Sequence, residues 1–283
     1  MKLSIAIADT TALPSAFVVY RGFEECIPKA ARLGFHGVEL ALRRAEEINS
    51  QKLQRLLQDN DLEVSGISTG QIYADGGLTL THENTQIREQ VKAVLQELID
   101  LAEVFGKIIN IGRVRGSIGN RSREFVEELF VEGARELCDY ALPKGVTLIL
   151  EPVNRYEIDF INNVDEGVLL MKKINKKNMM LMPDIFHMNI GDVAIGPVLA
   201  KNISYIKYIH FADSNRLAPG QGHTDFNKIM EDLFKAGYDG WVSAEILPKP
   251  DPDTAAELTA NFLLPRIKEY NHNRAGASKF PVF

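Results

Sequence analysis

The chain has 283 residues, 45% of them hydrophobic and 25% charged, and a formal net charge of −6. These values are ordinary for a globular protein, and the negative sign disfavours a surface that neutralises nucleic-acid phosphates. No uncharged run approaches the roughly 18–20 residues of a membrane span, and residues 1–11 lack the pattern of a signal peptide. The two cysteines, Cys26 and Cys138, exclude a disulfide framework. We therefore expect a cytoplasmic protein that binds neither membranes nor nucleic acid.

Short apolar runs alternate with longer amphipathic segments along the chain. The apolar runs are rich in Val and Ile, which is typical of strands buried on both faces, and span residues 3–8, 37–41, 62–68, 107–112, 146–152, 179–184, 203–212 and 240–246. The other segments have the spacing of helices with one apolar face and span residues 24–33, 50–58, 84–105, 121–142, 164–174, 195–201, 226–236 and 254–269. Four of these helices are followed by a glycine, which favours a left-handed C-cap: Gly34, Gly106, Gly145 and Gly237.

Eight strands that are each followed by a helix predict an α/β protein with a closed (β/α)8 barrel, the TIM-barrel fold. An open doubly wound sheet would need a glycine-rich phosphate turn after the first strand, but residues 9–14 read DTTALP. No linker or change of composition divides the chain. We therefore expect one barrel domain over residues 1–270 and a C-terminal tail, residues 271–283, beyond the last helix.

Four consecutive predicted strands end in a carboxylate or an imidazole: Glu151, Asp184, His210 and Glu245. In a barrel, functional side chains gather at the carboxyl ends of the strands. Three acids share one pocket only if a counter-charge is present, and one imidazole among oxygen ligands suits Mn²⁺ or Mg²⁺, with Co²⁺ also possible. We predict that these four residues bind a divalent metal. The alternative is that each makes a separate ion pair or helix cap.

Histidine and arginine residues near these strand ends are further candidates. His187 follows Asp184 by three residues, in a segment that we expect to be a loop. Arg216 lies in the Gly/Pro-rich loop after strand seven, where it could hold a substrate hydroxyl or carboxylate or pair with a nearby acid. Arg113 and Arg115 follow strand four and could grip an anion together or be a pair of surface charges.

A metal flanked by two carboxylates suits removal of a proton beside a ketone. The metal would bind the ketone and the adjacent hydroxyl and stabilise a cis-enediolate, while one glutamate takes the proton from one face. If Glu151 and Glu245 stand on opposite faces of the substrate, the second glutamate returns a proton there and the carbon is inverted. A single base that moves a proton between two carbons would instead make an aldose–ketose isomerase.

Four segments resemble a known superfamily: EPVNRYEIDFINN (151–163), MPDIFHMNI (182–190), HFADSNRLAPGQGHTDF (210–226) and SAEILP (243–248). They are similar to the sugar isomerase/epimerase superfamily of xylose-isomerase-like barrels and, within it, to ketose 3-epimerases of the D-tagatose 3-epimerase type. Residues 66–82 (GISTGQIYADGGLTLTH) and the turn IGRVRG most resemble the 5-keto-L-gluconate epimerases, which act on keto-acid sugars.

The resemblance implies the same metal set, of the Mn²⁺ type, and makes Glu151 and Glu245 the acid/base pair. It also implies that three further side chains bind or support the substrate: His187, Arg216 and Glu157. Arg113 and Arg115 would suit a carboxylate at the far end of the sugar. Barrels that resemble this one are commonly dimers or tetramers, so we expect a homo-oligomer.

The predicted function is therefore a metal-dependent epimerase that inverts the carbon beside the ketone of a ketose or a keto-acid sugar, of the 5-keto-L-gluconate or D-tagaturonate type. The alternatives are an aldose–ketose isomerase of the hydroxypyruvate isomerase type, a dehydratase of keto-polyols and a non-catalytic sugar-binding protein. A DNA-repair endonuclease of the same superfamily is disfavoured, because it uses more histidines and a basic groove. The position of the carbonyl and the mass of the product distinguish the three enzymes.

Overall fold

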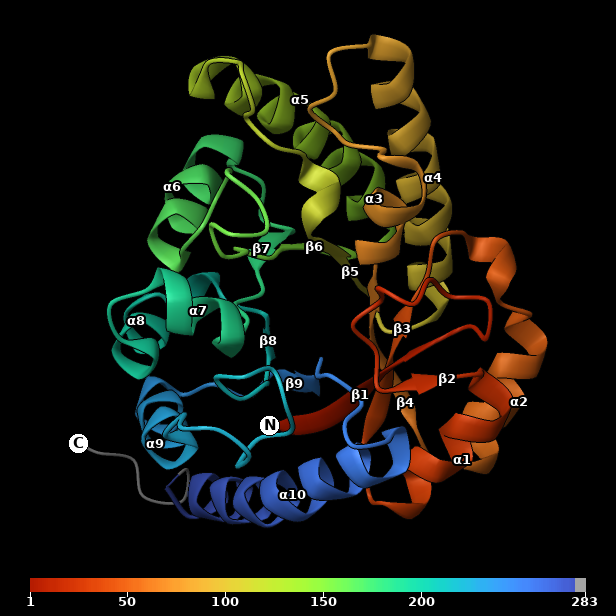
Figure 1. Ribbon diagram of the computed structural model, residues 1–283, viewed down its shortest axis with the longest axis vertical. Coiled ribbons are helices and arrows are strands. Elements are labelled where there is room, and N and C mark those ends of the chain that lie inside the picture. Colours follow the sequence, from red (N-terminus) through yellow and green to blue (C-terminus); the bar gives the residue numbers. More distant parts are fainter. Residues whose placement is uncertain (278–283) are drawn as a thin grey trace.

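Eight parallel strands form the wall of a barrel in the computed structural model, which describes residues 1–277 (Figure 1). These strands are β1 (Lys2–Ala8), β3 (Gly37–Ala41), β4 (Glu63–Ser68), β5 (Ile108–Ile111), β6 (Thr147–Leu150), β7 (Met179–Leu181), β8 (Tyr208–His210) and β9 (Trp241–Ala244). Their hydrogen-bonded order is β7-β6-β5-β4-β3-β1-β9-β8. Two isolated parallel bridges, Leu181–Ile206 and Asp184–His210, span the gap between β7 and β8. The predicted (β/α)8 barrel is confirmed.

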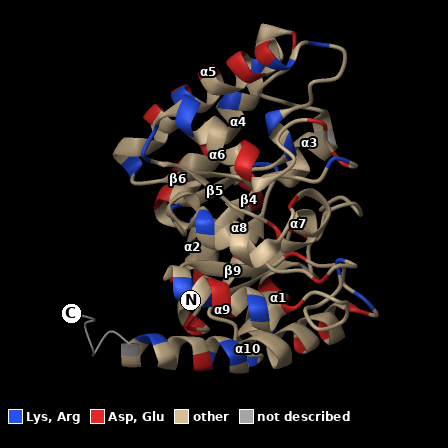
Figure 2. Ribbon diagram, turned by 90° about the vertical axis from the view of Figure 1, so that its left-hand side faces the viewer, with Lys and Arg blue, Asp and Glu red and all other residues tan. Residues whose placement is uncertain are grey.

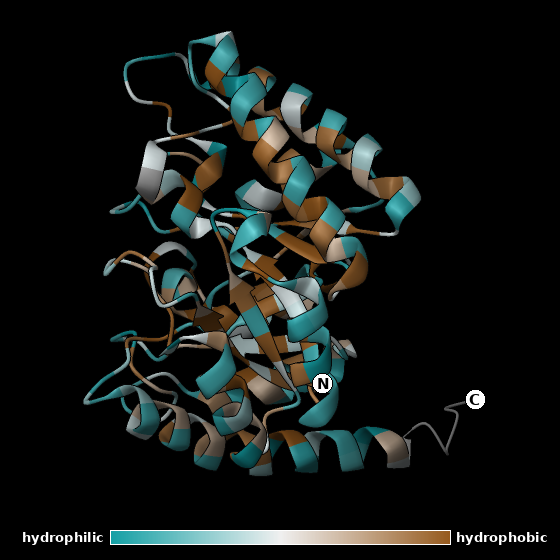
Figure 3. Ribbon diagram, turned by 90° about the vertical axis from the view of Figure 1, so that its right-hand side faces the viewer, coloured by the Kyte–Doolittle hydropathy of each residue, from teal (hydrophilic) through white to brown (hydrophobic). Residues whose placement is uncertain are grey.

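Helices surround the barrel and pack their apolar faces against it (Figure 1). They are α1 (Phe23–Arg32), α2 (Ser50–Asp59), α3 (Gly70–Gly76), α4 (Thr85–Val104), α5 (Arg123–Ala141), α6 (Val164–Ile174), α7 (Ile185–Gly191), α8 (Ile195–Lys201), α9 (Phe226–Ala236) and α10 (Pro252–Ala277). Charges of both signs are spread over the outer helices (Figure 2), and hydrophobic residues concentrate in the strands (Figure 3). Within residues 1–277, no helix is both long and apolar enough to cross a membrane.

Helix ends follow the capping residues that the sequence offers. The side chains of Asn84, Ser122 and Asn163 accept backbone hydrogen bonds at the N-termini of α4, α5 and α6. The four glycines predicted to follow helices all have φ between 70° and 88°, as expected for left-handed caps. At Gly106, a Cβ atom would also lie 2.6 Å from the carbonyl oxygen of Val64, so this close packing requires glycine.

Short elements at the barrel mouth were not predicted, because they are too short to show a helical or strand period. They include α3, α7 and the two-residue strand β2 (Tyr20–Arg21), which pairs with β1. His187 therefore lies on α7, which corrects the expectation of a loop. The last helix also continues beyond its predicted end to Ala277, so it includes the first part of the predicted tail. The rest of that tail, residues 278–283, lies outside the described residues.

The loop between β1 and β2 (residues 9–19, the β1–β2 loop) is fastened by one arginine. The Arg21 guanidinium donates to the carbonyl oxygens of Ala12 and Leu13 at 2.9 and 3.0 Å, and to those of Pro14 and Ala16 at 3.5 Å. Residues 15–18 of this loop line the cavity described below. These hydrogen bonds of Arg21, which we call the Arg21 clasp, therefore position one side of that cavity.

Candidate active site and metal centre

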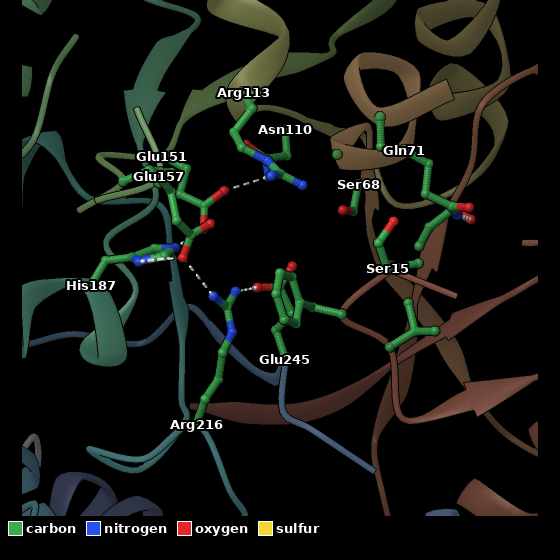
Figure 4. Close-up of a pocket in the computed structure, with 17 residues that line it drawn as sticks. Ser15, Ser68, Gln71, Asn110, Arg113, Glu151, Glu157, His187, Arg216 and Glu245 are labelled. Carbon is green, nitrogen blue, oxygen red and sulfur yellow. Dashed lines mark hydrogen bonds and ion pairs between the residues drawn. The ribbon is translucent and has the colours of Figure 1, made fainter. Parts of the chain in front are cut away.

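A cavity opens at the carboxyl ends of the strands, where barrels carry their functional groups. Six of the predicted site residues line it: Arg113, Glu151, Glu157, His187, Arg216 and Glu245. Two more, Asp184 and His210, are completely buried beside them. Figure 4 shows Arg216 and Arg113 extending into the cavity from opposite sides.

The structure brings the four predicted metal ligands together. Each of Glu151, Asp184, His210 and Glu245 offers one ligand atom, and these atoms all lie within 4.8 Å of one another. The Nδ1 atom of His210 is 3.7 Å from Glu151 Oε1, 3.7 Å from Glu245 Oε2 and 3.9 Å from Asp184 Oδ2. Within residues 1–277, the buried atoms His210 Nδ1 and Asp184 Oδ2 have no hydrogen-bond partner. Unpartnered buried polar atoms are costly, and three carboxylates around one imidazole nitrogen fit a divalent cation.

Local backbone structure orients two of these carboxylates. Asp184 is the N-cap residue of α7: its Oδ1 accepts from the Phe186 N–H at 2.7 Å, which leaves Oδ2 facing the cluster. Glu151 follows β6, and its Oε2 accepts from Asn110 Nδ2 at 3.3 Å. A Cβ atom at Gly112 would lie 2.9 Å from the same oxygen. A larger residue at this position would have to push that oxygen aside.

His210 is held by a carboxylate that the sequence analysis did not single out. Glu39 on β3 is 2% exposed, and its two oxygens lie 3.0 and 3.1 Å from His210 Nε2. Because an ionised carboxylate can only accept, Nε2 carries a proton in either charge state of the ring. Glu39 and Glu245 outweigh burial and raise the pKa of His210 well above its usual value, so a metal ion would have to displace the second proton, on Nδ1, to gain that lone pair. The available signal was a charged residue within the apolar run GVELA (37–41).

His187 presents a proton to the same cluster. Its Nδ1 is 2.8 Å from Asn154 Nδ2, which also donates to Glu157 Oε1 at 3.1 Å. Since an amide nitrogen only donates, Nδ1 accepts and Nε2 carries the proton, 3.7 Å from Glu151 Oε1. Burial and the charge of Arg216 lower the pKa of His187 to about 3, so the ring is neutral. Asn154 was not predicted, although it belongs to the same NRYE segment as Glu157.

Arg216 bridges two carboxylates of the cavity. It donates from Nη2 to Glu245 Oε2 at 2.7 Å and from Nη1 to Glu157 Oε1 at 3.1 Å (Figure 4). Its guanidinium carbon lies 3.7 Å from the ring centre of Phe17 and 4.8 Å from that of Phe186. The predicted position at the barrel mouth and the alternative of pairing with an acid are therefore both observed.

The two predicted anion-binding arginines are separated, which corrects the expectation of a joint grip. Arg115 is fully buried and does not line the cavity. Its guanidinium donates at 2.8–3.0 Å to four backbone carbonyl oxygens, those of Gly112, Glu151, Phe160 and Ile161. Arg113 does line the cavity, with its guanidinium carbon 5.5 Å from the Tyr73 ring centre. Of these two arginines, only Arg113 is therefore left as a candidate for binding an anionic group of the substrate.

Burial favours the neutral form of all three carboxyl groups of the cluster and so tends to raise their pKa values. It raises the pKa of Glu245 to about 7 and that of Asp184 to about 6. At Glu151, burial is outweighed by the interaction with His210, which lowers the pKa of this carboxyl to about 2. Two glutamates with pKa values driven apart are typical of an acid/base pair. A bound cation would favour the charged form of each carboxylate.

Apart from Arg113, the remaining wall of the cavity is uncharged and combines apolar side chains with four polar ones. Its polar residues are Ser15, Ser68, Gln71 and Asn110, which we call the neutral wall. They come from the β1–β2 loop, β4, α3 and β5. Ser68 lies in the sequence GISTG (66–70), which has the spacing of a nucleophile elbow. Within the described residues, however, no histidine hydrogen-bonds to its hydroxyl, so this spacing does not indicate a nucleophile.

Comparisons with known proteins agree on one group. A family model described as a xylose isomerase-like TIM barrel matches residues 27–265. A D-psicose 3-epimerase of Ruminiclostridium cellulolyticum is 30% identical over 236 residues, which cover 77% of this chain and 76% of that protein. A 3-dehydro-D-guloside 4-epimerase of Escherichia coli is 26% identical over 75% of this chain and 82% of its own length.

A solved structure supports the same fold. The crystal structure of D-psicose 3-epimerase with D-tagatose from Clostridium cellulolyticum H10 covers 93% of this chain and 98% of its own, with a TM-score of 0.79 and 24% sequence identity. The similarity to ketose 3-epimerases predicted from the four segments is confirmed. The narrower resemblance to 5-keto-L-gluconate epimerases stays a prediction.

Proposed function

Because the chain belongs to the xylose isomerase-like TIM barrels, we propose that it is a metal-dependent epimerase of keto sugars. Its curated relatives are named as sugar epimerases. They confirm the predicted enzyme class, an isomerase of the carbohydrate-epimerase type. The reaction that we propose inverts the carbon beside the ketone of a ketose or a keto-acid sugar.

One observation carries this proposal: two of the glutamates that line the cavity, Glu151 and Glu245, also belong to the four-residue cluster. Glu151 Oε1 and Glu245 Oε2 are each 3.7 Å from His210 Nδ1. A substrate bound at the cluster would therefore have a carboxylate from β6 and another from the end of β9 within reach of its reacting carbon. This arrangement supports exchange of a proton on two faces of that carbon, which is what inversion requires.

A divalent cation held by the cluster would polarise the ketone and stabilise the negative charge that develops on its oxygen, which is worth several kcal/mol. One glutamate removes the proton from the carbon beside the ketone, and the other returns a proton from the opposite face. Each positioned group contributes about 10²- to 10⁴-fold. His187 Nε2–H and the Arg216 guanidinium orient the substrate by donating to its oxygens, and Glu157 accepts from a hydroxyl.

The same proposal includes an identity for the metal and a class of substrate. The mixed oxygen and imidazole ligands suit Mn²⁺, with Mg²⁺ or Co²⁺ as alternatives. Arg113 would pair with the carboxylate of a keto-acid sugar of the 5-keto-L-gluconate or D-tagaturonate type. Assembly into a dimer or tetramer and a cytoplasmic location stay predictions.

The direct test is turnover in deuterated water. The metal-free protein is incubated with ketoses and keto-acid sugars, with and without Mn²⁺, and the products are analysed by NMR and mass spectrometry. We expect Mn²⁺-dependent deuterium at the inverted carbon beside an unmoved ketone, lost on adding a chelator and restored by excess Mn²⁺. A shifted carbonyl would identify an isomerase, loss of water a dehydratase, and binding without turnover a sugar-binding protein.

A further inference from the structure

A charged side chain is buried in the barrel interior beside His210 of the cluster. Glu39 has 2% of its surface exposed, and its neighbours along β3, Val38 and Leu40, are fully buried. Burying a carboxylate costs several kcal/mol unless other groups compensate for it. Its presence there therefore needs an explanation in terms of its partners.

The partners of Glu39 lie in one direction, towards β8. His210 Nε2 is within 3.1 Å of both carboxylate oxygens, and the Tyr208 hydroxyl donates to Oε2 at 3.0 Å. The Tyr208 oxygen is in turn 3.1 Å from Ser4 Oγ and 2.7 Å from Ser65 Oγ, in β1 and β4. The Tyr208 hydroxyl that donates to Glu39 is thus itself held from β1 and β4.

The Glu39 carboxylate faces Nε2 of His210, so the other ring nitrogen, Nδ1, faces the cluster. Nδ1 is buried, has no hydrogen-bond partner within residues 1–277 and faces three carboxylates at 3.7–3.9 Å. A metal ligand must present a lone pair, and a hydrogen bond from the other ring nitrogen selects that tautomer and the ring orientation.

We propose that Glu39, held by Tyr208, is a positioning residue that keeps Nδ1 of His210 aimed at the cluster and so sets the affinity of the site for a divalent cation. This inference rests on the proposed function only in so far as the cluster binds a cation. Glu39 does not line the cavity and does not touch the substrate. It acts through His210 alone.

The test is Mn²⁺ binding in the absence of substrate, measured by calorimetry and by the electron paramagnetic resonance of free Mn²⁺. In Glu39→Gln the side chain keeps its size, but it loses its charge and can present an N–H group to the imidazole. We expect the affinity for Mn²⁺ to fall about 10- to 100-fold, and Tyr208→Phe to lower it in the same direction but less. Glu63→Gln, which changes an exposed carboxylate on the neighbouring strand β4, is the matched control and should bind as the wild type does.

Two further readouts separate positioning from simple structural support. With Mg²⁺ bound, ¹⁵N NMR of the His210 ring should show a protonated Nε2 in the wild type and a mixed or displaced signal in Glu39→Gln. Excess Mn²⁺ should restore turnover in that variant. If Glu39→Gln does not fold, Tyr208→Phe carries the same measurements.

Unchanged Mn²⁺ affinity in Glu39→Gln, or in Tyr208→Phe if that variant alone folds, would overturn the inference, even if thermal stability fell. The same holds for a variant whose activity excess Mn²⁺ does not restore. If the wild type itself bound no divalent cation, the proposed function would fail instead, which is a distinguishable result.

Discussion

The two sides of the barrel mouth differ in the chemistry that they present. The side formed by β6 to β9 carries the charged cluster, with Glu151 and Glu245 at the cavity surface. The side formed by β1 to β5 carries the neutral wall together with Arg113. We infer that the first side performs the proton transfer and the second selects the substrate. Changes on the first side should therefore affect every substrate alike, and changes on the second should discriminate among substrates.

The largest effect should come from the glutamates of the charged side. We expect Glu151→Gln and Glu245→Gln each to lower kcat about 10³-fold or more for every substrate, because each removes an acid/base group and a metal ligand. The measurement is kcat at saturating Mn²⁺, with thermal unfolding to show that the fold survives. Glu132→Gln, an exposed carboxylate on α5, is the control. Substantial residual activity in either variant would refute the two-base scheme.

A smaller effect should follow from moving Glu151 without changing its chemistry. A Cβ atom at Gly112 would lie 2.9 Å from Glu151 Oε2, so Gly112→Ala must displace that carboxylate. We expect kcat to fall about 10- to 100-fold, since a small misplacement of a reacting group is costly. In Gly133→Ala on α5 the nearest atom would be 3.6 Å away, so this control should retain full activity. Equal activity of the two variants would mean that the position of Glu151 is not critical.

Substitution of Arg113 and Arg115, which the sequence analysis had paired, tests the comparison between the two sides further. Arg113→Ala should raise KM for a keto-acid sugar about 10-fold or more and leave a neutral ketose unaffected, because a charged hydrogen bond is lost. Arg115→Ala should instead lower the melting temperature, since each buried carbonyl left without a donor costs about 1–3 kcal/mol. Steady-state kinetics with both substrates and thermal unfolding distinguish them. Equal weakening of both substrates by Arg113→Ala would exclude a carboxylate grip.

The smallest effect concerns stability away from the site. Burial raises the pKa of Asp192 from 3.8 to about 6, so the folded protein holds more protons than the unfolded chain between these values. The contribution of Asp192 to stability should therefore fall as the pH rises from about 4 to 6 and stay level above that range. Asn at this position still accepts from the Val164 N–H, which Asp192 Oδ1 does at 3.2 Å.

Urea unfolding of Asp192→Asn at pH 4, 5, 6 and 7 tests this expectation. The variant should match the wild type at pH 4 and be more stable than it at pH 7. A difference between the two proteins that does not depend on pH would contradict the raised pKa.

The charged side could be predicted from the sequence because an ionisable residue directly after an apolar run stands out in a single chain. Glu151, Asp184, His210 and Glu245 each follow such a run, and the barrel topology places the ends of their strands at one rim. The strands of the barrel wall and the longer helices were predictable for a related reason. Their patterns of apolar residues extend over enough positions to be recognised in the sequence.

The neutral wall could not be predicted in the same way. Ser15, Ser68 and Gln71 are ordinary loop and helix residues in the sequence, and only the folded chain brings them to the cavity. The different positions of Arg113 and Arg115 depend on the loop after β5. In its single 3-10 turn, Arg113–Arg115, the Arg113 side chain lines the cavity, whereas the Arg115 guanidinium is buried among backbone carbonyl groups. Glu39 was visible as an acid within a strand, but its partner lies 171 residues further along the chain.

The Arg21 clasp has a consequence for how this barrel could acquire new substrates. Its hydrogen bonds end on main-chain oxygens of residues 12–16, so they do not depend on which side chains those residues carry. Ser15 and its neighbours can therefore be exchanged while the loop keeps its course over the cavity. A library confined to Ser15, Ala16 and Val18, which leaves in place the Phe17 ring packed on Arg216, should therefore redirect specificity without disturbing the proton-transfer groups.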